Sequence, residues 1–129
     1  MRQLTKHFNQ SEFMCHDGSE MPLDVLYNVL RAAEQLEVLR AVLGEPIYIN
    51  SAYRSKAYNR SVGGKAKSQH VLGKAVDIHT KNHTPEQLYL IIDELIGSGK
   101  MREGGLGLYD NFIHYDIRGT KARWDYREK

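Results

Sequence analysis

Apolar positions along the chain follow a helical spacing in some segments and a strand spacing in others. Between Pro22 and Gly44, leucine, valine and alanine recur every three or four positions, with charged residues between them. Proline suits the first turn of a helix and glycine its end, so this range is predicted to form one long helix. A second helix is expected after the cap residue Thr84, where LYLIIDELI supplies an apolar stripe that ends at Gly97.

Four shorter segments have the composition and spacing of strands. In AVDIHT the two-residue period places Val76 and Ile78 on one side, and Asp77 on the other with Ala75 and His79. Polar residues 56–67 carry two adjacent glycines and predict a short helical turn followed by a loop. The pattern predicts an α+β fold, with helices packed on one face of a small, mainly antiparallel sheet. The expected strands cover residues 46–50, 75–80, 105–109 and 112–118.

Size and composition narrow the class of protein. A chain of 129 residues and 14.8 kDa is expected to form a single domain over residues 1–129, without a separate binding module. A hydrophobic share of 41% is typical of a globular protein, and a net charge of +2 is too small to indicate nucleic acid. The lone Cys15 excludes an intrachain disulfide and is interpreted as a packing residue. Neither a membrane span nor an apolar signal segment is visible, so we expect cytoplasmic synthesis and a monomer.

Two histidines and an aspartate stand out as candidate metal ligands. His70 and Asp77 lie in SQHVLGKAVD, and His114 lies in FIHYDIR. Two imidazoles and one carboxylate fill three positions of a tetrahedral zinc site and leave the fourth open, which is typical of catalytic zinc. Gly73 permits a backbone turn between the first two ligands, and the small Ala75 keeps the approach clear. We therefore expect Zn²⁺ on the sheet face opposite the helices.

These motifs resemble those of the D-alanyl-D-alanine metallopeptidase family. SQHVLGKAVD contains every fixed letter of that family's zinc signature, SxHxxGxAxD. SAYRS resembles the family's arginine motif, and YDNFIHYDIR resembles the segment that carries its third zinc ligand. The similarity runs from about Phe8 to Trp124 and is greatest to the branch of zinc D-alanyl-D-alanine carboxypeptidases and phage lysins. It implies peptidoglycan stem peptides as substrate, which a chain without a signal peptide reaches through lysis, a holin or delivery on a virion.

The resemblance also suggests roles for residues around the metal. Arg54, in SAYRS, is expected to bind a substrate carboxylate or the oxyanion of the tetrahedral intermediate. Ser68 either donates a hydrogen bond to substrate or caps the turn before His70. Tyr109 either orients substrate or packs against its neighbours, and Trp124 is expected to close the core.

The general base is less clearly marked than the ligands. Many family members have an acidic residue three positions before the third ligand, and here that position is Asn111. If residues 112–118 form a strand, Asp116 lies on the same face as His114 and can reach the water or hydrogen-bond a ligand. Asp116 is therefore the preferred base, with Asp110 and Glu103 as competing carboxylates.

Three functions fit these observations. The first is a zinc peptidase that cleaves stem peptides as a D,D-carboxypeptidase or a lytic endopeptidase. The second is a zinc-bearing binding domain that has lost turnover, which the missing acid at Asn111 makes reasonable. The third is an intracellular dipeptidase that acts on cell-wall fragments.

Overall fold

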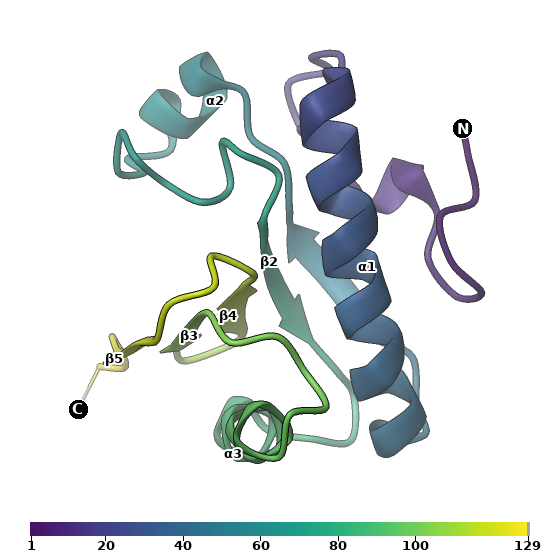
Figure 1. Ribbon diagram of the computed structural model, residues 1–129. Helices are drawn as coiled ribbons and strands as arrows, with labels where there is room; N and C mark the ends of the chain where they lie inside the picture. The colour runs from purple at the N-terminus through teal and green to yellow at the C-terminus, as the bar shows by residue number, and fades with distance from the viewer. Residues whose placement is uncertain (129) are drawn as a thin grey trace.

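The computed structural model describes residues 1–128 and shows an α+β fold (Figure 1). Helix α1 runs along one side of the sheet, and α3 lies below the sheet in this view. The arrangement agrees with the expected α+β architecture. The elements in chain order are η1 (Gln10–Phe13), α1 (Leu23–Leu43), β1 (Tyr48–Ser51), α2 (Lys56–Ser61), β2 (Ala75–His79), α3 (Pro85–Gly97), β3 (Gly105–Leu108), β4 (Ile113–Asp116) and β5 (Ala122–Asp125).

Both long helices begin and end where the sequence predicts. Pro22 precedes α1, and Gly44 ends it in the left-handed conformation at φ 68°, with its N–H donating to the carbonyl of Arg40. At the start of α3, the Thr84 hydroxyl accepts from the backbone N–H of Gln87, whose side chain accepts from the backbone N–H of Thr84. Along residues 1–128, no helix is both long and apolar enough to cross a membrane.

The sheet has the strand order β1-β2-β4-β3-β5. Neighbouring strands are antiparallel except β3 and β5, which pair in parallel, so the prediction of a mainly antiparallel sheet is confirmed. Strand β5 was not predicted; KARWDY does alternate between polar and apolar residues, but the segment is short and rich in charge, and the alternation was overlooked. It forms the edge strand beside β3 and carries the C-terminal end of the chain (Figure 1).

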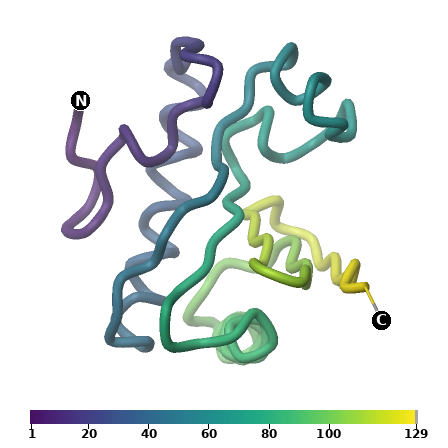
Figure 2. The backbone as a smooth tube through the Cα atoms, turned by 180° about the vertical axis from the view of Figure 1, so that it is seen from behind, coloured from purple at the N-terminus to yellow at the C-terminus, as the bar shows by residue number. Residues whose placement is uncertain are grey.

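Side chains alternate between the two faces of the sheet. Val76 and Ile78 on β2 lie in the core, whereas Asp77 points to the opposite face. Helix α1 contacts β2, and α3 contacts β3 and β4. Figure 2 shows, from behind, that the segment between α2 and β2 and the C-terminal segment lie on the side of β2 away from α1. Core residues of the sheet and its helices include Leu106, Leu108, Ile113, Tyr115, Val29, Leu36, Leu39, Leu88 and Ile92.

Candidate metal centre

The three predicted ligands come together on the sheet face away from α1. Asp77 on β2 is the register partner of His114 on β4, so their side chains lie next to each other. His70 reaches them from the turn before β2, which Gly73 makes possible through its positive φ of 76°. One Asp77 carboxylate oxygen, Oδ1, lies 3.2 Å from His70 Nε2 and 3.1 Å from His114 Nδ1. One ligand atom from each residue lies within 4.8 Å of the others, and all three residues are buried.

In both imidazoles, the contact of the nitrogen that faces away from Asp77 fixes whether the nitrogen that faces Asp77 carries a proton or a lone pair. His70 Nδ1 lies 2.7 Å from the carbonyl of Ala52, which can only accept, so Nδ1 carries the proton. His114 Nε2 lies 2.7 Å from a carboxylate oxygen of Asp116 and donates to it. With neutral rings, His70 Nε2 and His114 Nδ1 therefore direct lone pairs toward Asp77. Two lone pairs and a carboxylate oxygen repel one another unless a cation lies between them, so this donor set fits a metal ion such as zinc.

The charges of the ligands and of Asp116 also favour a cation between the ligand atoms. Burial acts to raise the pKa of Asp77, but hydrogen bonds from His114 and His70 outweigh it and hold that pKa well below its ordinary value. Burial acts to lower the pKa of His114, yet its contacts with Asp116 and Asp77 raise it. Without a metal, the carboxylates favour a protonated imidazole. A divalent cation at the same place satisfies them instead.

Asp116 is fully buried and surrounded by donors. Its Oδ1 accepts from the backbone N–H groups of Gly105 and Arg118, at 2.9 and 3.1 Å, and from Arg118 Nε at 2.8 Å. Its Oδ2 accepts from Arg118 Nη2 and from His114 Nε2, both at 2.7 Å. A Cβ at Gly105 would lie 2.2 Å from Oδ2, so glycine is needed for this close approach. The predicted shared face of His114 and Asp116 is confirmed, and the contacts fix the orientation of the His114 ring.

The competing carboxylates lie away from the metal ligands. Glu103 accepts from Arg123 Nη2 at 3.0 Å and from the backbone of Gly104. Asp110 is exposed and accepts from the backbone of Glu128 at 3.3 Å. Like Asp116, neither lines the cleft above the metal ligands. Of the carboxylates in residues 1–128, Asp77 alone lines it.

A cleft of about 600 Å³ opens at the ligand group. All three ligand residues line it, so a substrate in the cleft would lie next to the metal site. One set of lining residues is cationic and another is aromatic. The cationic residues are Arg54, Lys65, Lys67 and Arg118, and the aromatic residues are Tyr109, Phe112, Trp124 and Tyr126.

Trp124 lies at this cleft, so the prediction that it closes the core is wrong. Its ring centroid is 5.0 Å from that of His114. Its register partner is Gly107, where a Cβ would lie 2.2 Å from the indole nitrogen, and only glycine leaves room for the indole. The residue was missed as a site residue because its position depends on the unpredicted pairing of β3 with β5. Gly107, between two leucines of a strand, was the available signal of a close approach.

Tyr109 is held in the aromatic part of the cleft. Its ring stacks on Phe112 at a centroid distance of 4.4 Å, and its hydroxyl accepts a 3.1 Å hydrogen bond from Trp124 Nε1. No acceptor for the hydroxyl proton is found among the residues that the structure describes, so this proton is free for a ligand. Burial raises the pKa of Tyr109, which keeps the phenol protonated at neutral pH.

Arg54 lies beside the ligand group, as SAYRS predicts. A register shift between Ile49 and Ser51 pairs Ser51 with Asp77 and brings the arginine toward the site. Its guanidinium donates to Ser51 Oγ at 3.2 Å and to Asn59 Oδ1 at 3.3 Å, and lies 3.5 Å from Asp77 Oδ2. Asn59 on α2 is only 3% exposed and was not singled out in the sequence. No signal in the sequence marks it, because its burial and its contacts with Arg54 and Lys65 are visible only in the structure.

Ser68 has one of its two expected contacts in the structure. Its hydroxyl accepts from the backbone N–H of His70 at 3.2 Å, so it caps the turn that carries this ligand. It also lines the cleft. His79, on the same strand as Asp77, is exposed and pairs with Asn50 outside the ligand group.

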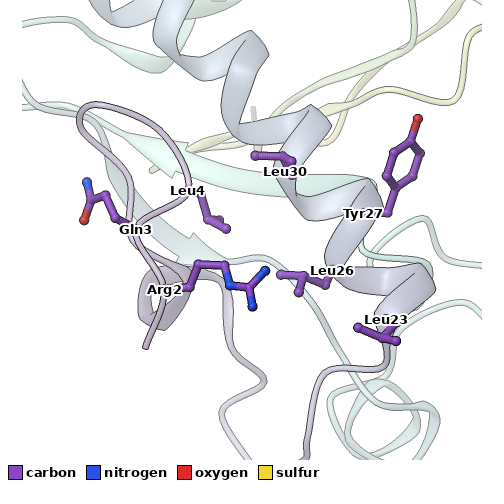
Figure 3. A pocket seen from close by; sticks show the side chains of 7 residues that line it. All are labelled: Arg2, Gln3, Leu4, Leu23, Leu26, Tyr27 and Leu30. Carbon is purple, nitrogen blue, oxygen red and sulfur yellow. The ribbon is translucent and has the colours of Figure 1, made fainter.

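A second hollow, of about 320 Å³, lies between the N-terminal segment and α1. Figure 3 shows Arg2 extending from that segment toward Leu26, among the leucines of the helix. It shares no lining residue with the cleft at His70 and contains no candidate ligand. The metal chemistry therefore belongs to the larger cleft.

The buried group of His70, Asp77 and His114 at an open cleft could hold a metal ion, as in a metal-dependent enzyme. The sequence profile described as Peptidase M15 matches residues 6–116, which include His70, Asp77 and His114. The chain belongs to the peptidase M15 family, so the resemblance to D-alanyl-D-alanine metallopeptidases is confirmed and the family implies a metallopeptidase. Among curated proteins, none matches the chain.

Proposed function

We propose that the protein is a zinc peptidase that hydrolyses peptide bonds in peptidoglycan stem peptides. The observation that carries the proposal is the convergence of His70 Nε2, His114 Nδ1 and an Asp77 oxygen at the bottom of a cleft in a peptidase M15 chain. These three residues would hold zinc, which when bound would polarise the scissile carbonyl and acidify a water molecule.

Arg54 is proposed to bind negative charge on the substrate. Ser51 and Asn59, which are both uncharged, hold its guanidinium beside Asp77. It can therefore bind a substrate carboxylate or the oxygen that becomes negative during hydrolysis. Ser68 and Tyr109 line the same cleft, and the free phenol proton of Tyr109 can be donated to a substrate oxygen.

Asp116 is better suited to orienting His114 than to accepting a proton from substrate or water. It accepts five hydrogen bonds, from Gly105, Arg118 and His114, and it does not line the cleft. Those donors, above all Arg118 and His114, outweigh the effect of burial and hold the pKa of Asp116 well below its ordinary value. It therefore stays ionised and keeps the His114 Nδ1 lone pair directed at the metal.

A second candidate function is a zinc-bearing domain that binds wall peptides without cleaving them. It is favoured by one observation: within residues 1–128, the single carboxylate that lines the cleft, Asp77, is already committed as a ligand. Hydrolysis normally requires a group that accepts a proton from water, and here no free carboxylate in the cleft offers itself. Turnover separates the two functions.

Mass spectrometry of purified peptidoglycan tests the proposal. We expect incubation with zinc-loaded protein to release shortened stem peptides, and a chelator to abolish the release. The mass lost identifies a carboxypeptidase or an endopeptidase. A His70→Ala protein serves as the matched control, because it loses one of the three metal ligands. It also loses the contact between His70 and the backbone carbonyl of Ala52. Intact peptides after incubation with a fully zinc-loaded protein would favour the binding domain.

A further inference from the structure

The cleft carries an excess of positive charge on the side formed by the segment between α2 and β2. Lys65 and Lys67 both line it and are exposed. In the part of the chain that the structure describes, neither lysine has an acidic partner. Arg118, by contrast, is paired bidentately with Asp116, so its charge is compensated. Arg54 Nη2 lies 3.5 Å from Asp77 Oδ2, so part of its charge is also compensated, and the two lysines make the uncompensated positive charge of the cleft.

The lysine segment is tied to the residue that holds Arg54. Asn59 Nδ2 donates to the carbonyl of Lys65 at 2.8 Å, while Asn59 Oδ1 accepts from Arg54 Nη1. The backbone N–H of Gly64 donates to the Asn59 carbonyl at 2.8 Å, and a Cβ on Gly64 would lie 2.0 Å from Asn59 Oδ1. One buried side chain thus fixes Arg54 and the backbone of Lys65 relative to each other. Lys65, Lys67 and Arg54 together form a cationic wall on one side of the cleft.

We infer that this wall selects anionic peptides, with a substrate carboxylate bound by Lys65 and Lys67 in addition to the negative charge that Arg54 faces. The inference rests on the proposed function and names its substrate class: a peptide with an acidic residue close to the scissile bond. The aromatic residues that line the rest of the cleft, among them Tyr109 and Tyr126, suit the less polar parts of the same peptide.

The expected preference is modest, because the lysines are exposed. An exposed ion pair changes an equilibrium by only a few-fold, so two lysines together predict roughly fivefold tighter binding of a carboxylate than of a carboxamide. Screening weakens such contacts as salt rises. The preference is expected to disappear between about 0.01 M and 1 M ionic strength, where the Debye length falls from about 30 Å to about 3 Å.

Two dye-labelled peptides that differ only in one group, a carboxylate or its carboxamide on the residue next to the scissile bond, test the inference. Their binding to zinc-loaded protein is read by fluorescence anisotropy immediately after mixing, and their hydrolysis by mass spectrometry. The Lys65→Gln/Lys67→Gln protein is compared with a Lys6→Gln/Lys100→Gln protein, which loses the same charge at exposed positions outside the cleft.

The wild-type and control proteins are expected to bind the carboxylate peptide about fivefold more tightly, and the Lys65→Gln/Lys67→Gln protein to bind both peptides alike. Equal binding of the two peptides by the wild type, no binding of either, or an undiminished preference in the Lys65→Gln/Lys67→Gln protein overturns the inference. Tight, selective binding without hydrolysis supports the anionic subsite and counts against the peptidase proposal alone.

Discussion

Replacing Asp116 by asparagine preserves the size of the side chain but turns one acceptor oxygen into an amino group. If the amino group faces His114, it donates to Nε2, the ring proton moves to Nδ1, and the lone pair directed at the metal is lost. If it occupies the place of Oδ1, it opposes the N–H groups of Gly105 and Arg118 that now donate there. Either orientation disturbs the position or the tautomer of a ligand.

The size of the effect follows from these contacts. Loss of a partner that orients a metal-bound histidine typically lowers metal affinity by about 10- to 100-fold, or about 1.4 to 2.8 kcal/mol. Leaving the buried donors of Gly105 or Arg118 without an acceptor costs about 1 to 3 kcal/mol of folding stability. We therefore expect Asp116→Asn to bind zinc about 10- to 100-fold more weakly, and excess zinc to restore most of its hydrolysis.

Zinc affinity is measured by competition with a coloured chelator, and hydrolysis is then measured on wall peptides at saturating zinc. Arg118→Gln separates the effects, because Arg118 contacts Asp116 but not the His114 ring, and should lower stability with little loss of zinc. Asp110→Asn and Glu103→Gln lie outside the cleft and should leave both quantities unchanged.

The reasoning fails if Asp116→Asn keeps zinc at full affinity and yet loses hydrolysis by a factor of about 100 or more, since that outcome defines a proton acceptor. Loss of turnover in Asp110→Asn alone would place the base in the turn before β4.

Three further variants test the rest of the site. Arg54→Ala is expected to retain zinc and to lose turnover roughly a hundredfold, because the guanidinium acts on substrate charge, and unchanged kinetics would make it a surface residue. His70→Ala and His114→Ala should each lower zinc content sharply from about one ion per chain, which elemental analysis measures, and full occupancy in either variant would remove that residue from the ligand set. Gly107→Ala places a Cβ 2.2 Å from the indole nitrogen of Trp124 and should lower the melting temperature through about 1 to 3 kcal/mol of overpacking, and an unchanged melting curve would show that β5 can move.

Local patterns were enough to predict most of the fold. The spacing between Pro22 and Gly44 predicted α1, and the alternation in AVDIHT placed Val76 and Ile78 in the core. The alternation of polar and apolar residues in KARWDY could have marked β5 as a strand, but its parallel pairing with β3 depends on a long-range contact that local patterns do not reveal.

The metal ligands were predictable because His70 and Asp77 belong to one recognisable segment. Asn59 was not predictable, since an asparagine on a short polar helix is usually a surface residue. Its role becomes visible only through its hydrogen bonds to Arg54 and to the backbone of Lys65. On the aromatic side of the cleft, Tyr109 was among the candidate residues, but Trp124 was missed as a site residue for a related reason. Trp124 approaches His114 only because β3 separates their strands and has a glycine at the crossing point.

Residues of β5 and its C-terminal neighbour Tyr126 line one side of the cleft, and they lie outside the part of the sequence that the family match covers. The ligands lie within residues 6–116, the range matched by the family, whereas Ala122, Trp124 and Tyr126 line the cleft from beyond it. Trp124 packs on the metal ligand His114, whereas Ala122 and Tyr126 are not among the metal ligands. Directed evolution of the residues at 122 and 126 can therefore alter which peptides are accepted while the metal site stays as it is.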